Sequence, residues 1–144
     1  TRQQLNERSE RNVNQLLRIV ADLEDMTDDC FSLSLTLQRS RVKKREFSKK
    51  EIEALNPYVL LVRDFLSFVK DNLGHQITPE QSAYATDLEN KIDQLRNKLR
   101  KLARKRIEAG SNVKTELLFI DLVRRIEKLG DYCYSISEAL GHME

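Results

Sequence analysis

The sequence predicts an all-α protein, folded as an antiparallel up-down four-helix bundle. Apolar residues recur three and four positions apart along most of the chain, which is the periodicity of helices that bury one face. Glycine and proline are scarce, with four glycines and two prolines in 144 residues. The connections between the predicted helices are short, and short connections make neighbouring helices antiparallel.

The first two helices are predicted at about residues 9–41 and from Ser48 to near Gly74. In the first, these apolar residues share one face: Val13, Leu16, Leu17, Val20, Leu23, Cys30, Leu33 and Leu37. The second begins at a capping box, in which the Ser48 hydroxyl and the Glu51 carboxylate each accept a hydrogen bond from the other residue's backbone N–H. Because Pro57 lacks an N–H, we expect a kink or a short break there.

The third helix has the clearest start, with Thr78 as N-cap, Pro79 at the first helical position and Gln81 at the third. Its apolar residues form a heptad seam: Ala85, Leu88, Ile92, Leu95, Leu99 and Leu102. After a turn at residues 109–112, the fourth helix ends at Gly141 and carries the apolar residues Leu118, Leu122, Ile126, Leu129, Cys133, Ile136 and Leu140.

Residues 16–37 reappear in degenerate form, and in register, at residues 119–140. Two of the identities are acidic: Glu24 matches Glu127, and Asp28 matches Asp131. Residues four apart in a helix share a face, so each Glu-x-x-x-Asp pair presents two carboxylates side by side. These acids are the strongest candidates for a functional site.

A third pair with this spacing, Glu89 and Asp93, lies beside the heptad seam of the third helix. It stands as far before the turn at residues 110–111 as Glu127 and Asp131 stand after it, so an antiparallel hairpin would bring the four carboxylates level. Such a group repels itself unless it is protonated or bridged by cations, and oxygen ligands favour Mg²⁺, Ca²⁺, Mn²⁺ or oxidised iron. The alternative is that each pair is an ordinary solvated helix surface.

Other chemistries find little support. A ferritin-like di-iron site uses Glu-x-x-His, and neither His75 nor His142 has a glutamate three positions before it. Structural zinc would require a Cys/His cluster, and the two cysteines lack the spacing of metal ligands. We expect both cysteines to be reduced residues of the core. Ser32 and Ser135 have no histidine base nearby and no glycine-rich phosphate loop is present, so we predict that the chain is not an enzyme.

Although the net charge is only +2, the sequence contains two clusters of basic residues. A four-helix bundle would place both clusters at the same end. They are Arg39, Arg41, Lys43, Lys44, Arg45, Lys49 and Lys50, and Arg96, Lys98, Arg100, Lys101, Arg104, Lys105 and Arg106. This end is either a solvated surface or a docking face for acidic lipid headgroups or an acidic protein. Nucleic acid is disfavoured because no aromatic residues are interleaved to stack on bases. No apolar run approaches the roughly 18 residues of a transmembrane helix.

Two stretches of this sequence resemble a known family. Residues 124–131 (RRIEKLGD) and 135–140 (SISEAL) resemble the signature helix of PhoU-type phosphate-regulatory domains. Residues 87–100 (DLENKIDQLRNKLR) resemble the preceding helix in the version fused to the C-terminus of bacterial sodium/phosphate cotransporters. The resemblance covers residues 84–140 and is weaker over the first helix.

The resemblance implies a single PhoU-like domain over residues 1–144, a cytoplasmic regulator of phosphate uptake held at the membrane by a fused or partner transporter. Residues 1–42 would be the last helix of a truncated first repeat, and residues 48–141 a complete three-helix second repeat. A multinuclear cluster of iron, zinc, manganese or a similar metal would bind Glu89, Asp93, Glu127 and Asp131 in the second repeat. Glu24 and Asp28 would be the metal ligands on the last helix of the first repeat. The implied partner is a phosphate transporter membrane domain or its regulators, and an anionic membrane and a second copy of the chain are further candidates. The rival interpretation is a metal-free helical scaffold that docks through its basic end.

Overall fold

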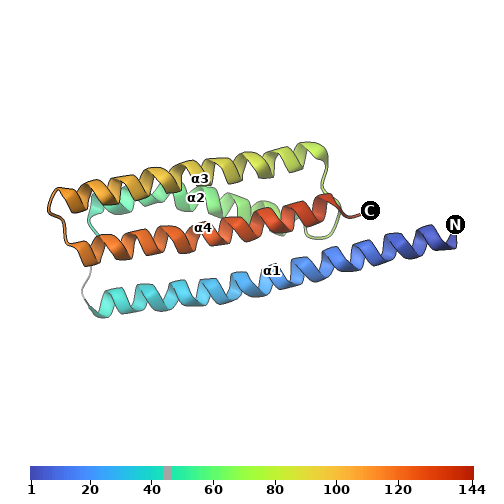
Figure 1. Ribbon diagram of the computed structural model, residues 1–144, viewed down its shortest axis with the longest axis horizontal. Coiled ribbons are helices and arrows are strands. Elements are labelled where there is room, and N and C mark those ends of the chain that lie inside the picture. Colours follow the sequence, from blue (N-terminus) through green and yellow to red (C-terminus); the bar gives the residue numbers. More distant parts are fainter. Residues whose placement is uncertain (44–46) are drawn as a thin grey trace.

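The computed structural model describes residues 1–43 and 47–144 and confirms the all-α prediction. Its four helices are α1 (Arg2–Val42), α2 (Lys49–Asn72), α3 (Pro79–Glu108) and α4 (Val113–Gly141), and successive helices run in opposite directions (Figure 1). In the described part of the chain, no helix is long and apolar enough to cross a membrane.

The capping signals account for most of the helix starts. Thr78 is the N-cap of α3 as predicted, and with Gln81 it forms a capping box, with N···O distances of 3.1 and 2.9 Å. A second capping box, between Thr1 and Gln4, starts α1 about seven residues earlier than predicted. Helix α2 starts at Ser48 as predicted, but it continues unbroken through Pro57.

The predicted capping box at the start of α2 forms only in part. The Ser48 hydroxyl accepts a hydrogen bond from the Glu51 N–H, at 3.2 Å. The Glu51 side chain instead turns inward, and its Oε1 lies 3.7 Å from Nε of Arg106 on α3. The glutamate therefore links two helices rather than closing its own helix end.

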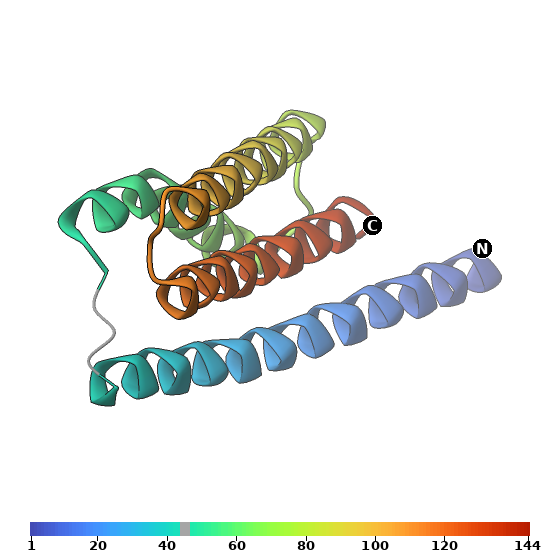
Figure 2. The same cartoon turned by 60° about the vertical axis from the view of Figure 1, so that its left-hand side comes forward.

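The core lies among α2, α3 and α4. The third-helix seam is buried or half-buried along its whole length, as predicted. Tyr58, Phe65 and Phe119 are fully buried, and the Tyr58 hydroxyl donates to the Val123 carbonyl at 2.9 Å. Helix α1 packs against α4 alone, on the outside of this three-helix unit (Figure 2).

The prediction for the buried face of α1 was wrong. The residues of α1 that are buried are Ile19, Met26 and Ser40, which belong to a stripe one position away from the predicted apolar one. Most of the predicted stripe is exposed, including Leu17 at 62% and Val20 at 60%. Cys30, expected in the core, is also exposed, whereas Cys133 is buried. A single helix packed on one side of α1 leaves its more apolar side uncovered.

Both basic turns lie at one end of the molecule, where α1 and α3 end and α2 and α4 begin (Figure 1). Arg41, Lys43, Arg104 and Lys105 are exposed there, while Lys44 and Arg45 lie outside the described residues. Arg106 departs from the prediction because it turns inward, where its Nε lies 3.0 Å from both carboxylate oxygens of the fully buried Glu116.

Candidate metal centre

A glycine lies where α4 packs on α3. A Cβ at Gly130 would lie 3.3 Å from Cδ1 of the buried Ile92, which is tighter than ordinary packing. A larger residue there would require the Ile92 side chain to shift slightly. The next residue, Asp131, and the acids on either side of Ile92 are then brought across the same helix pair.

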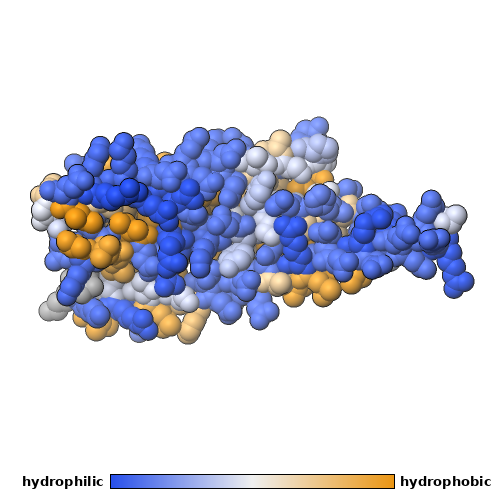
Figure 3. All heavy atoms as spheres, in the orientation of Figure 1, coloured by the Kyte–Doolittle hydropathy of each residue, from blue (hydrophilic) through white to orange (hydrophobic). Residues whose placement is uncertain are grey.

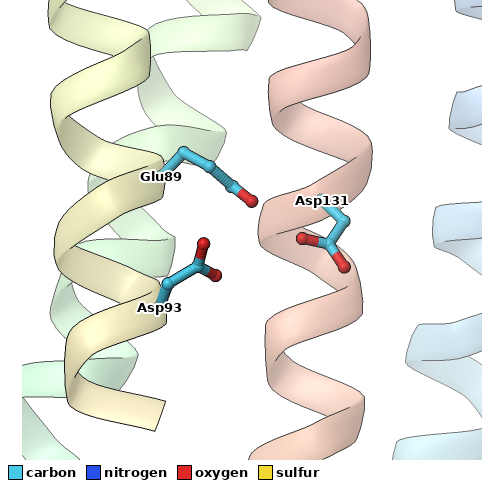
Figure 4. A group of neighbouring side chains, drawn as sticks. All are labelled: Glu89, Asp93 and Asp131. Carbon is cyan, nitrogen blue, oxygen red and sulfur yellow. The ribbon is translucent and has the colours of Figure 1, made fainter. Parts of the chain in front are cut away.

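Three carboxylates meet at this level. Glu89 and Asp93 lie one turn apart on α3, and their side chains point toward Asp131 on α4 (Figure 4). One oxygen from each carboxylate lies within 4.8 Å of the others. Within residues 1–43 and 47–144, this is the one group of three acidic, histidine or cysteine side chains close enough to share a metal ion. We refer to it as the acidic triad.

The electrostatics of the acidic triad favour a bound cation or a bound proton. Burial, followed by a hydrogen bond and the charge of Asp131, raises the pKa of Glu89 to about 8. The Glu89 Oε2 atom is buried and has no hydrogen-bond partner. Three hard oxygen donors, one with an unsatisfied buried atom, fit a cation such as Mn²⁺, Mg²⁺ or oxidised iron.

Glu127, the fourth predicted ligand of this site, is paired with arginines instead. Its Oε1 accepts a hydrogen bond from Nη1 of Arg96, and its Oε2 lies 4.0 Å from Nη2 of Arg100. Arg96 also reaches Asp93 at 3.4 Å, so one guanidinium neutralises part of the acidic group. The sequence reasoning assigned Arg96 to the basic cluster and missed its pairing with these acids, although its position three residues after Asp93 is the spacing of a helical ion pair.

Glu24 and Asp28 do not join any such group. Both are exposed on α1 and lie outside the stripe that packs against α4. Two other acids of α1 face α4. Asp22 accepts a hydrogen bond from the Ser135 hydroxyl at 2.6 Å. Burial of Tyr132 is the main cause that raises its pKa, and the negative charge of Asp29 is the second. A metal site at Glu24 and Asp28 therefore stays a prediction that needs a partner from elsewhere.

A comparison with protein families points to the same helix pair. Residues 75–140 match the model of the PhoU domain, a regulatory rather than catalytic family. The matched segment contains α3 and nearly all of α4, and thus the whole acidic triad, whereas α1 and α2 lie outside it. No curated protein and no solved structure matched the chain.

Proposed function

We propose that this chain is a PhoU-type domain that regulates phosphate uptake and binds metal ions at the acidic triad. The observation that carries the proposal is that the segment matching the PhoU domain holds the three convergent carboxylates. We further propose that the chain is the cytoplasmic tail of a sodium/phosphate cotransporter, as the resemblance of residues 87–100 implies.

In this proposal, Glu89, Asp93 and Asp131 hold the metal, which supplies positive charge at a surface junction between two helices. Glu89 must give up its proton to bind, so a metal ion replaces a proton between α3 and α4. Arg96 keeps Glu127 and Asp93 oriented and limits how much further positive charge the site accepts. Metal occupancy would then set how firmly α3 and α4 are held together along this hairpin, which a transporter in contact with it can sense.

Phosphate uptake tests the regulatory role. Cells that carry Glu89→Gln with Asp131→Asn in the encoded protein are expected to lose the difference in phosphate uptake between phosphate-rich and phosphate-poor growth, because the site that holds the regulatory metal is gone. Radiolabelled phosphate uptake measures this, with Asp87→Asn as the matched control, since Asp87 pairs with Lys91 on the exposed side of the same helix. Unchanged regulation in the double variant would contradict the proposal.

A second candidate function, docking on an anionic surface, is favoured by the basic end. Within the described residues, Arg41, Lys43, Arg104 and Lys105 form no ion pair with an acidic side chain. Unpaired cations that share one end of a molecule create a field that attracts anionic lipid headgroups.

Vesicle binding tests this second candidate. Vesicles with acidic headgroups are expected to bind the chain, and added salt that shortens the Debye length from ~10 Å to ~3 Å should weaken binding sharply. Reversing Arg41, Lys43 and Arg104 to Glu should release the chain without unfolding it, because exposed charges contribute little to stability. The control reverses Arg2, Arg8 and Lys70, which lie toward the other end of their helices. Binding that ignores salt, or that both triple variants lose equally, would contradict docking through the basic end.

A further inference from the structure

A buried ion cluster joins three helix ends at the basic end of the molecule. Glu51 comes from the first turn of α2, Arg106 from the last turn of α3, and Glu116 from the first turn of α4. Glu116 is fully buried and Glu51 is only 8% exposed, so both carboxyl groups are largely removed from water. We call these three residues the Arg106 cluster.

The Arg106 cluster contains two carboxyl groups but one guanidinium. Within the described residues, Arg106 is the one basic side chain in ion-pair contact with either acid. The charged groups that act on Glu51 are Glu116 from α4 and Arg106 from α3, while α1 does not contact α2. If both acids were ionised, one negative charge would be left without a partner in a buried place. Proteins avoid such a charge by keeping a proton on one of the two groups.

The contacts of the two acids differ, and the difference shows which of them keeps the proton. Nε of Arg106 lies 3.0 Å from both oxygens of Glu116, and the Ser111 hydroxyl donates to Glu116 at 2.9 Å. These donors stabilise the ionised form of Glu116. Oε1 of Glu51 lies 3.7 Å from the same Nε, which is too far for a hydrogen bond, and its buried Oε2 has no hydrogen-bond partner. Burial, followed by the charge of Glu116, raises the pKa of Glu51 above its ordinary value.

We propose that Glu51 holds a proton in the folded chain, and that this proton keeps the first turn of α2 closed against α3 and α4. When Glu51 releases the proton to solvent, its new negative charge lies beside that of Glu116 in a buried contact. The repulsion then favours an open first turn, in which Glu51 reaches water. This proton-controlled contact lies at the basic end, away from the acidic triad, and does not depend on the proposed function.

Opening this turn would change the surface of the basic end. Lys49 and Lys50 lie in the same turn and would move with it. Apolar surface already lies at this end, on the left in Figure 3, and Val113 and Leu117 at the start of α4 are more than half exposed. Phe119, which is now fully buried and packs under Arg106, would become accessible as well. Release of one proton therefore changes both the charge and the apolar area of this end.

Hydrogen exchange in the first turn of α2 measures the opening. The Ile52 N–H donates to the Ser48 carbonyl at 3.1 Å, and it exchanges with solvent when this bond breaks. Between the ordinary pKa of Glu51, 4.5, and its higher folded value, the open turn binds fewer protons than the closed turn does. The protection factor, which corrects for the exchange rate of a free amide, should therefore fall roughly tenfold per pH unit through this window and level off above it.

Two variants assign this pH dependence to Glu51. Glu51→Gln has nearly the same shape and no ionisable group, so Ile52 should keep its low-pH protection across the window. Glu53→Gln makes the same change at an exposed glutamate of the same turn, and it should keep the native pH dependence. Glu89 also affects global unfolding in all three chains, and the amide of the buried Val69, near the other end of α2, records that effect separately.

A carbon-13 NMR titration of the native chain measures the proton directly and does not depend on any variant folding. The side-chain carboxyl carbon of Glu51 is expected to titrate above pH 4.5. A midpoint at or below this value would overturn the proposal. So would Ile52 protection that is as flat in the native chain as in Glu51→Gln, or a pH dependence that Glu53→Gln removes equally well.

Discussion

Replacing Arg106 by alanine is expected to lower the free energy of unfolding by about 3 kcal/mol. Arg106 is the cation that neutralises Glu116, whose side chain is 0% exposed, and its Nε lies 3.0 Å from both carboxylate oxygens. The Ser111 hydroxyl also donates to Glu116, at 2.9 Å, but it carries no charge. Without Arg106, a buried carboxylate is left with no opposing charge. The variant also loses the guanidinium that lies 4.7 Å from the centre of the Phe119 ring.

Urea denaturation of the two chains measures this loss. The matched control is Arg104→Ala, which removes an exposed arginine two positions away and should change stability by less than about 0.5 kcal/mol. A double change, Arg106→Met with Glu116→Leu, should recover part of the loss, because apolar residues of similar size avoid the cost of burying a charge, although the buried Glu51 still lacks its arginine. An Arg106→Ala variant as stable as the control would show that Glu116 is not held by its arginine.

Glu89→Gln is expected to stabilise the metal-free chain at high pH and to leave it nearly unchanged at low pH. In the folded chain the pKa of Glu89 is about 8, against an ordinary value of 4.5. Between these two values the unfolded chain binds fewer protons at this residue than the folded chain does. The free energy of unfolding therefore falls as the pH rises through this window. Glutamine carries no ionisable group, so the variant escapes this loss.

Unfolding curves across that pH range measure the difference between the two chains. We expect an advantage for the variant on the order of 1–2 kcal/mol above the folded pKa, a size already reduced for screening by solvent. Glu80→Gln, at an exposed position in the first turn of the same helix, is the control and should show no such trend. A difference that does not grow with pH would contradict the account of Glu89 as a buried, repelled carboxyl group.

The sequence predicted the features that depend on neighbouring residues. The start of α3 was correct because the hydroxyl of Thr78 and the amide of Gln81 satisfy the helix end locally. The burial of the α3 seam was correct because all its apolar residues lie on one stripe. The level placement of Glu89 and Asp131 followed from counting residues on each side of one short turn.

The features that the sequence did not predict depend on contacts between distant residues. Helix α1 has two neighbouring stripes with heptad spacing, and periodicity does not tell which of them packs against α4. The stripe through Ile19 and Met26 is the less apolar of the two, so hydrophobicity favoured the wrong one. Similarly, counting residues brought Glu127 level with Asp93, but only the structure shows that Arg96 binds it.

A titration of Mn²⁺ into the chain, followed by thermal unfolding above the pKa of Glu89, tests the central claim most directly. A metal that binds only the folded chain stabilises it by mass action, by about 2.7 kcal/mol at a hundredfold excess over Kd. The account predicts that Mn²⁺ raises the melting temperature, that the rise shrinks at lower pH as Glu89 takes up its proton, and that Glu89→Gln with Asp131→Asn abolishes it. A double variant that responds to Mn²⁺ as strongly as the native chain would contradict the claim that the acidic triad holds the metal.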